Sequence, residues 1–285
     1  MDPVFLTSII ALGGLGLIFG AGLAFASKKF AVQIDPKVEQ IIEVLPGANC
    51  GACGQPGCSA YAEAVAAGRV PPNRCTPGGA DVAQMVASIM GLSGLELEEP
   101  KVAVVCCQGN RELAVEKFIY EGVEDCHAAQ LIGGGHKACS YGCLGLGTCV
   151  RACPFGAMYM REDGLPFVIE EKCTACGICV SVCPRKIMQL IPRSQAVFLA
   201  CVSLDKLKEV KSVCKVGCFA CKICATPKVT PSGAIIMDGN LPKIIDIRSE
   251  ELFAAVDKCP TSCYIVRGQV PEHLQKNEIT QQQEN

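Results

Sequence analysis

Cysteine is the residue type with the greatest chemical capacity in this chain, and its spacing is specific. The chain has 22 cysteines among 285 residues. The segment from Cys173 to Pro184 has the sequence C-T-A-C-G-I-C-V-S-V-C-P, which is the ligand arrangement of proteins with paired [4Fe-4S] clusters. Three closely spaced thiolates bind one cluster, and the cysteine before proline binds the other cluster of the pair. Disulfide bonding has no reason to adopt this spacing, so we interpret these cysteines as iron ligands.

A repeat of 30 residues indicates that this unit is duplicated. Residues 149–158 (C-V-R-A-C-P-F-G-A-M) match residues 179–188 (C-V-S-V-C-P-R-K-I-M). In the first copy Leu146 occupies the position of the middle cysteine, and we expect Cys139 to replace it. The prediction for one cluster is therefore Cys139, Cys143, Cys149 and Cys183. The prediction for its partner is Cys153, Cys173, Cys176 and Cys179.

An earlier group of cysteines predicts a separate cluster. The loop N-C-G-A-C-G-Q-P-G-C, which ends at Cys58, has glycines that permit tight turns and leave backbone N–H groups free to face cluster sulfurs. The predicted ligands are Cys50, Cys53, Cys58 and Cys75. Four cysteines also suit zinc, but the ferredoxin segment further along the chain favours iron.

A third, incomplete copy of the repeat follows. It keeps a close cysteine triplet, but Lys228 stands where the next cysteine is expected, and no second triplet precedes Cys259. The lost cysteines would all have served the same cluster, so this copy is expected to hold one cluster. Its predicted ligands are Cys218, Cys221, Cys224 and Cys259. Cys214 is an alternative to Cys259, and spacing leaves both open.

The cysteines that remain allow a fifth cluster built from residues remote in sequence. The candidate ligands are Cys107, Cys126, Cys201 and Cys214. Buried free cysteine is the alternative for each of them. Cys106 ends a β-branched segment that begins at Lys101, and neighbouring residues of a strand face opposite sides. We therefore expect only one of Cys106 and Cys107 to reach a cluster, and Cys263 has no predicted role.

Other sequence motifs carry little chemistry. Residues 133–135 (G-G-G) do not fit the dinucleotide pattern and predict a turn. His127 and His136 lie beside cysteines, but a Rieske site needs two histidines with a matched cysteine pair, so neither is expected to bind iron. A lysine-rich stretch near the third triplet is either an ordinary solvated surface or a surface that steers an acidic redox partner. Its members are Lys206, Lys208, Lys211, Lys215 and Lys222.

The elements that position these cysteines form an α+β chain with several parts. Residues 4–26 carry no charge, are long enough to span a bilayer, and precede Lys28 and Lys29, which predicts a transmembrane helix with the rest of the chain in the cytoplasm. Residues 31–98 form a small [4Fe-4S] domain. Residues 99–200 form a linker strand and a two-cluster ferredoxin domain with βαβ repeats. Residues 201–268 form a degenerate ferredoxin-like domain, and residues 269–285 a disordered tail.

Composition narrows the function. A net charge of −2 argues against nucleic-acid binding. The chain has no Trp and only 5% aromatic residues, so burial must depend on aliphatic side chains and on the clusters themselves, and iron removal is expected to unfold much of the protein. Without a flavin or nicotinamide fingerprint or an acid–base constellation, the expected function is one-electron transfer between proteins.

The order of these parts resembles one family over nearly the whole chain. It combines an N-terminal membrane helix, the C-G-A-C-G-Q-P-G-C loop with Cys75, the segment C-S-Y-G-C-L-G-L-G-T-C-V-R-A-C-P, and the intact ferredoxin segment. This combination resembles the B subunit of the Rnf complex, the ion-translocating ferredoxin:NAD oxidoreductase of bacteria. The resemblance implies a translocase component with four or five [4Fe-4S] clusters and no complete active site of its own, anchored in the bacterial inner membrane. It further implies electrons from reduced ferredoxin, and flavin-bearing, NAD-binding and membrane subunits as partners.

Two other functions fit parts of the sequence. One is a polyferredoxin that serves another membrane redox complex, such as a hydrogenase. The other is a methyl-transfer partner, because the first cysteine loop is similar to loops of corrinoid iron-sulfur proteins, but no corrinoid-binding domain is evident. In the relay, electrons enter near the third cysteine group and leave towards the Cys50 site, or run in reverse. Neither the direction nor sodium or proton coupling follows from the sequence.

Overall fold

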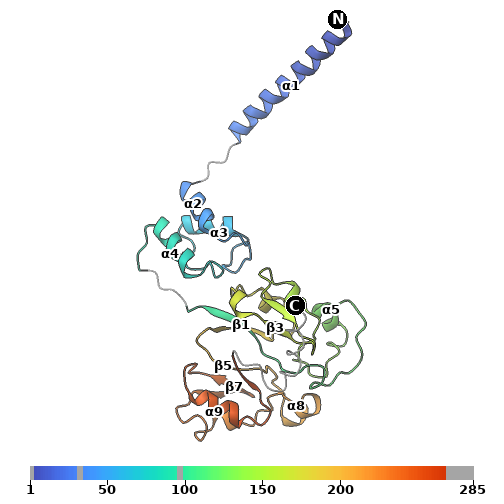
Figure 1. Cartoon of the computed structure of the whole chain (residues 1–285), viewed down its shortest axis with the longest axis vertical. Coiled ribbons are helices and arrows are strands. Elements are labelled where there is room, and N and C mark those ends of the chain that lie inside the picture. Colours follow the sequence, from blue (N-terminus) through green and yellow to red (C-terminus); the bar gives the residue numbers. More distant parts are fainter. Residues whose placement is uncertain (1–2, 31–34, 95–98, 268–285) are drawn as a thin grey trace, which may run out of the picture.

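The computed structural model describes residues 3–30, 35–94 and 99–267 (Figure 1). These residues form a long N-terminal helix, a small helical domain and a larger region of short helices and strands, arranged in that order along the molecule. The mixed α+β class is confirmed. The expected disordered tail, residues 269–285, lies outside the described residues.

Helix α1 (Pro3–Lys29) stands apart from the remainder of the chain (Figure 1). Its stretch Ile10–Lys29 is long and apolar enough to cross a membrane, for which about 20 residues are needed. Large apolar side chains such as Leu17 and Phe19 are exposed, and none of the stretch is buried against protein. The predicted helix is therefore confirmed, and its apolar surface suits a lipid environment.

The N-terminal domain contains three helices, α2 (Pro36–Val44), α3 (Cys58–Ala66) and α4 (Gly79–Ile89). Helix α2 begins where the sequence predicts, because the Asp35 side chain accepts a hydrogen bond from the backbone N–H of Lys37 at 2.9 Å and Pro36 occupies the first helical turn. The loop between α2 and α3 carries Cys50 and Cys53, and Cys58 is the first residue of α3.

The larger region is built from two-stranded antiparallel sheets. The pairs are β1 (Lys101–Val105) with β4 (Met188–Pro192), β2 (Met158–Met160) with β3 (Pro166–Val168), β5 (Val197–Leu199) with β8 (Tyr264–Val266), and β6 (Ile235–Asp238) with β7 (Leu241–Ile244). Pairs of such short strands are marginal in isolation. Their stability must come from what packs between them.

The sequence repeat appears as a repeat of elements. In the first copy α6 (Thr148–Arg151) precedes a Cys-Pro pair and strand β2, and in the second copy α7 (Ile178–Ser181) precedes a Cys-Pro pair and strand β4. The third copy retains a single 3-10 turn, η2 (Ile223–Ala225), followed by β6. Each copy therefore places one helical turn directly at its cysteine loop.

The remaining elements connect the copies. They are α5 (Cys126–Leu131), the 3-10 turn η1 (Glu170–Lys172), α8 (Leu207–Val213) and α9 (Glu251–Lys258). Strand β5 precedes the expected domain boundary at residue 200, yet it pairs with β8 of the third copy. Val197 in β5 belongs to the same core as Leu252 in α9.

Tyr61 organises the core of the N-terminal domain. Its side chain is fully buried with Ile41 and Val86. The hydroxyl donates a hydrogen bond to the carbonyl of Pro71 at 3.1 Å and accepts one from the backbone N–H of Arg74 at 3.2 Å. Burial raises the pKa of Tyr61 to about 12. The hydroxyl thus fixes the chain that leads to Cys75.

We predict that Tyr61→Phe lowers the local free energy of unfolding of this domain by about 1–3 kcal/mol, because two partly buried hydrogen bonds to the backbone are lost. Hydrogen exchange measured by mass spectrometry on the full chain should show faster exchange in α2–α4. Ser88→Ala is the control, since its hydroxyl bonds the carbonyl of Gln84 at an exposed position, and its effect should stay within about 0.5 kcal/mol. Unchanged exchange in Tyr61→Phe would contradict the prediction.

Candidate iron-sulfur cluster sites

All 22 cysteines are free thiols in the described residues, and the fold gathers most of them around separate pockets. The N-terminal site is lined by Cys50, Cys53, Cys58 and Cys75. Site A is lined by Cys126, Cys143, Cys149 and Cys183. The bridging site is lined by Cys107, Cys139, Cys201 and Cys214, with Cys106 beside them. The C-terminal site is lined by Cys218, Cys221, Cys224 and Cys259, with Cys263 beside them.

Site B is defined here as Cys153, Cys173, Cys176 and Cys179. Cys179 lies in the same core cluster as Cys153 and Cys173. Burial, together with charges on Cys173 and Cys176, raises the pKa of Cys179 to about 12. In the described ranges no three Cys, His, Asp or Glu side chains converge as the ligands of a single metal ion do.

The cysteine loops of the three copies share one backbone conformation. Left-handed residues recur two and four positions after the first cysteine of each loop: Gly145 and Gly147, Ala175 and Gly177, Ala220 and Lys222, with φ between 55° and 79°. Non-glycine residues adopt this region at a cost. The repeated conformation therefore indicates that each loop is shaped to surround the same kind of cluster, even where Leu146 has replaced a cysteine.

Backbone N–H groups point at several of the cysteine sulfurs. Ala103 donates to Cys173 Sγ at 3.5 Å, Gly145 to Cys143 Sγ at 3.4 Å, and Cys263 to Cys259 Sγ at 3.3 Å. Such bonds stabilise the thiolate form that ligates metals and help to set cluster potentials. The donor set, the loop conformation and the N–H groups thus fit [4Fe-4S] clusters.

Site A differs from the sequence-based grouping in one member, because Cys126 lines it where Cys139 was expected. The cause is a capping arrangement at the start of α5. The Asp125 side chain accepts from His127 N and Ala128 N. Thr148 Oγ1 accepts from Cys126 N at 2.8 Å and donates to Asp125 at 3.0 Å. Cys126 is thereby held against the first residue of α6.

This arrangement had a faint sequence signal. Asp125 is a good N-cap residue before an apolar stretch, but nothing in the sequence indicates that Thr148, 23 residues later, is its partner. Cys139 is displaced in turn to the bridging site.

The bridging site joins residues that are remote in sequence. Cys107 follows β1, Cys201 follows β5, and Cys214 ends α8. Burial raises the pKa of Cys107, and also raises the pKa of Cys201 to about 12. Apart from the exchange of Cys126 for Cys139, the expected group is brought together here.

The C-terminal site contains Cys259 in its wall, whereas Cys214, the alternative, lies in the bridging site. Cys263 is buried beside it, 3.1 Å from the carbonyl of Val216. Interactions with the Cys263 side chain and with its backbone N–H, which donates to Cys259 Sγ at 3.3 Å, lower the pKa of Cys259 to about 5. Sequence reasoning gave Cys263 no role, and the structure places it as a donor to a candidate ligand.

Three further motifs have structural explanations. Cys106 belongs to the hydrophobic core next to β1, although it also borders the bridging site together with Cys107. His127 Nε2 lies 2.9 Å from the carbonyl of Val182. His136 stacks on Tyr120, with ring centroids 5.9 Å apart. The glycine triplet forms the predicted turn, with positive φ at all three residues.

Neighbouring sites touch through backbone and thiol groups. Cys143 N of site A donates to Cys107 Sγ of the bridging site at 3.4 Å. Cys218 N of the C-terminal site donates to Cys201 Sγ of the bridging site at 3.3 Å. The bridging site therefore lies between site A and the C-terminal site.

The other neighbours follow from packing and charge. Cys149 of site A and Cys179 of site B belong to one core cluster. Burial raises the pKa of Cys176, and a charge on Cys50 of the N-terminal site raises it further. The five groups therefore follow one another in the order N-terminal site, site B, site A, bridging site, C-terminal site.

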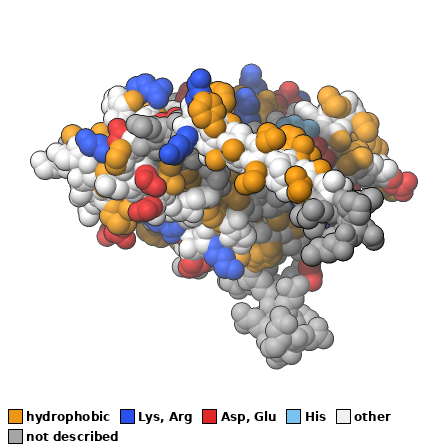
Figure 2. All heavy atoms as spheres, turned by 90° about the horizontal axis from the view of Figure 1, so that it is seen from above, with side chains coloured by type: hydrophobic (Ala, Val, Ile, Leu, Met, Phe, Trp, Pro, Cys, Tyr) orange, Lys and Arg blue, Asp and Glu red, His pale blue; other side chains and the backbone are white. Residues whose placement is uncertain are grey.

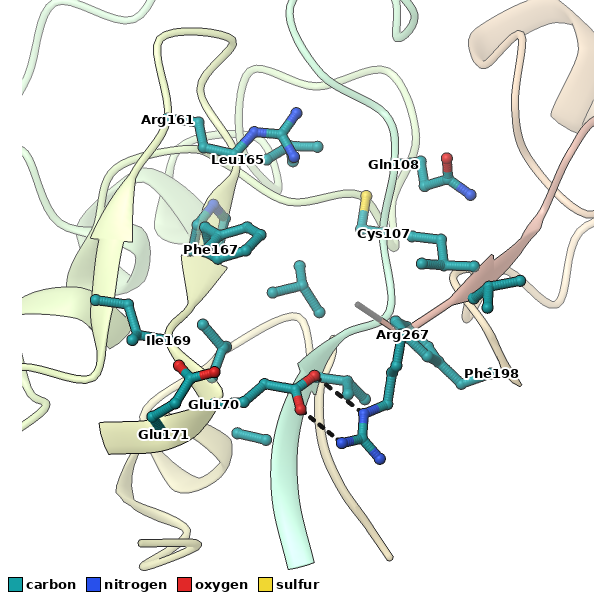
Figure 3. A pocket seen from close by; sticks show the side chains of 17 residues that line it. Cys107, Gln108, Arg161, Leu165, Phe167, Ile169, Glu170, Glu171, Phe198 and Arg267 are labelled. Carbon is teal, nitrogen blue, oxygen red and sulfur yellow. Dashed lines mark hydrogen bonds and ion pairs between the residues drawn. The ribbon is translucent and has the colours of Figure 1, made fainter. Parts of the chain in front are cut away.

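A cavity of about 320 Å³ lies between β1, β3 and β8 (Figure 3). It is lined largely by apolar side chains such as Phe167 and Phe198, and Glu170 and Arg267 form an ion pair at one side of it. Arg267 also donates to the carbonyls of residues 192, 193 and 195. These contacts fasten the third copy to the first two, so that the bridging site can form.

Comparisons with known proteins agree with the cysteine geometry. The family model "Putative Fe-S cluster" matches residues 45–77, and the model "4Fe-4S dicluster domain" matches residues 138–188. The first of these ranges contains the N-terminal loop, and the second contains most of sites A and B.

Three curated relatives match most of the chain, and each is the B subunit of its complex. That of the Na(+)-translocating ferredoxin:NAD(+) oxidoreductase complex of Acetobacterium woodii is 45% identical over 88% of this chain and 75% of its own length. That of the ion-translocating oxidoreductase complex of Methanosarcina acetivorans is 41% identical over 94% of this chain and 100% of its own. That of the proton-translocating ferredoxin:NAD(+) oxidoreductase complex of Clostridium ljungdahlii is 45% identical over 95% of this chain and 96% of its own length. The chain therefore belongs to the family of B subunits of ion-translocating (Rnf-type) oxidoreductase complexes.

Proposed function

We propose that this chain is the multi-cluster electron relay of an ion-translocating ferredoxin:NAD oxidoreductase. The observation that supports it is the continuous order of five cysteine sites, in which each group has a close neighbour in the next. A structural role would not require such an order. The proposed ligands are the four cysteines that define each of the five sites, with Cys106 and Cys263 left as buried thiols.

Each [4Fe-4S] cluster, when bound, would accept and release one electron. The protein's own residues hold the thiolates, exclude water and set the electrostatic environment of each site. Cys143 N–H and Cys218 N–H, which bond a sulfur of the bridging site, connect the ligand sets of adjacent sites directly. These short connections favour transfer along the chain.

The C-terminal site is the proposed point of electron entry. Cys221 is exposed, unlike the other cysteines. The lysines of the adjacent stretch are exposed as well. The opposite end of the molecule, seen from above in the frame of Figure 1, mixes Lys and Arg with Asp, Glu and apolar side chains (Figure 2). Positive charge near an exposed site suits a small acidic donor, and reduced ferredoxin is the proposed one.

The N-terminal site lies at the other end of the relay, next in sequence to α1. In the proposed orientation α1 crosses the bacterial inner membrane once, and Lys28 and Lys29 keep the cluster sites on the cytoplasmic side. Electrons would leave there towards flavin-bearing and NAD-binding partner subunits in the membrane complex. The chain would have no complete active site of its own.

The second candidate is a polyferredoxin subunit of another membrane complex, such as a hydrogenase. The exposed Cys221 serves it equally, because any acidic one-electron donor could dock there. The two functions separate on the donor and on the catalytic subunits that purify with the chain.

The first test is anaerobic iron and sulfide analysis of the full chain in detergent, followed by reduction with ferredoxin. About sixteen to twenty irons per chain are expected, for four or five clusters, with EPR signals that appear when reduced ferredoxin is added. The reduction rate should fall as ionic strength rises. Zinc or much less iron would refute the relay, and fully loaded protein that ferredoxin does not reduce would refute the donor.

The assignment of Cys126 to site A and of Cys139 to the bridging site can be tested by measuring the iron content of double variants. Cys126→Ala with Cys143→Ala should remove ligands of one cluster and lose about four irons. Cys139→Ala with Cys143→Ala should damage two clusters and lose about eight. The grouping from sequence spacing alone gives the opposite result, so the pair of measurements decides between them.

Electron entry at the C-terminal site can be tested by removing one positive charge from the surface beside it. Lys222→Asn removes a positive charge beside Cys221, and Asn tolerates the left-handed backbone there, where φ is 63°. The rate of reduction by ferredoxin at low salt should fall about 2- to 5-fold, the size of one exposed charge pair. Lys186→Asn is the matched control, since Lys186 is also exposed with φ of 54° but follows a ligand of site A. Equal effects of both variants would contradict entry at the C-terminal site.

A further inference from the structure

Arg185 is a buried cation. The residue is only 8% exposed. One guanidinium nitrogen donates to the carbonyl of Gly134, and among the described residues Nε has no hydrogen-bond partner. Within residues 3–30, 35–94 and 99–267, no Asp or Glu lies at ion-pair distance from it. An uncompensated buried charge is costly, so another source of negative charge must face it.

The negative charge available to Arg185 is that of the cysteine sites. The residue lines the pocket of site A together with Cys126, Cys143 and Cys183. Burial lowers the pKa of Arg185, and negative charge on the nearby sulfurs opposes this shift; these sulfurs belong to Cys139, Cys183, Cys126 and Cys143. Three of these belong to site A, and Cys139 belongs to the bridging site.

The glycine triplet makes room for this side chain. A Cβ atom on Gly135 would lie 2.9 Å from a guanidinium nitrogen of Arg185 and 2.6 Å from Leu144. The φ of Gly135 is +85°, which side chains rarely adopt. The turn therefore both accepts a hydrogen bond from Arg185 and leaves the space in which the guanidinium lies.

Comparison of the two copies of the repeat shows that only the second copy has an arginine at this position. Arg185 is two residues after Cys183, and the equivalent position after Cys153 is the half-buried Phe155. Site B has a nearby cation, Arg193, which donates to the carbonyl of Cys173 at 2.9 Å. That cation lies beside Glu170, whose carboxylate is paired with Arg267.

We propose that Arg185 tunes the reduction potential of site A. Its buried positive charge makes the cluster of site A easier to reduce than that of site B. The proposal rests on the proposed function, because it needs clusters at both sites. When one electron passes to site A from a reduced neighbour, that site gains one negative charge and the neighbour loses one, and no bond or proton moves. The fixed guanidinium offsets the added charge in a region where water screens little. An electron would then rest at site A, midway along the relay.

The test is an EPR-monitored redox titration of the full, iron-loaded chain with dithionite as reductant. Arg185→Met and Arg185→Gln both remove the charge, and Gln keeps a donor for the carbonyl of Gly134. In each variant one midpoint potential should fall by at least about 59 mV, which corresponds to a tenfold weaker one-electron reduction. The other potentials should move much less. Arg185→Lys should stay close to the unmodified protein.

Arg151→Met is the control, because Arg151 is two residues after Cys149 of the same site but is exposed. It should shift no potential comparably, since solvent screens its charge. Loaded neutral variants with unchanged potentials would overturn the proposal, as would an equal shift in Arg151→Met. Loss of iron in both neutral variants while Arg185→Lys stays loaded would overturn it in favour of a structural role. Absence of clusters from the unmodified chain would refute the proposed function instead.

Discussion

The ligation of buried thiolates is the interaction on which the rest of this structure depends. Every sheet in the larger region has two short strands, and the cores between them include cysteines such as Cys143, Cys179 and Cys224. Burial raises the pKa of all three. Without iron these sulfurs would be protonated or would repel one another as thiolates, and the strands would have little to pack against.

The same constraint joins the third copy to the first two copies. The bridging site needs Cys107 from the end of β1, Cys139 from the first copy, and Cys201 and Cys214 from the third. Its ligands therefore hold the copies together, assisted by Arg267, which reaches Glu170 and three backbone carbonyls of the second copy. A relay of separate ferredoxin domains on flexible linkers would have no such junction. Here the junction coincides with one of the five cysteine sites.

The two copies of the repeat differ in the residues around their cysteine sites. The first copy has Leu146 in place of a cysteine, and Cys126 from outside the repeat lines site A with Cys143, Cys149 and Cys183. The second copy has Arg185 where the first has Phe155, so the two sites of the pair have different electrostatic surroundings. Duplication provides two equivalent loops, and these departures make the resulting sites unequal.

Much of the site was predictable because close cysteine triplets are local. The C-x2-C-x2-C loops at Cys173 and Cys218, the loop at Cys50, the helix cap at Asp35 and the apolar helix α1 all follow from residues within one or two turns of each other. Local spacing fixes which thiolates can share a cluster, since a short loop has few ways to surround one.

Only the tertiary structure decided which site each sequence-distant cysteine lines. The choice between Cys126 and Cys139 depends on the hydrogen bonds of Thr148 to Cys126 and Asp125, and the choice between Cys214 and Cys259 depends on the packing of α8 against the bridging site. The counter-charge at Arg185 depends on a glycine turn whose hydrogen-bonded carbonyl lies 51 residues earlier. The sequence determined the number and chemistry of the loops, because that information is local. The fold determined how the sites are completed and ordered, because those contacts join segments whose separation along the chain carries no distance information.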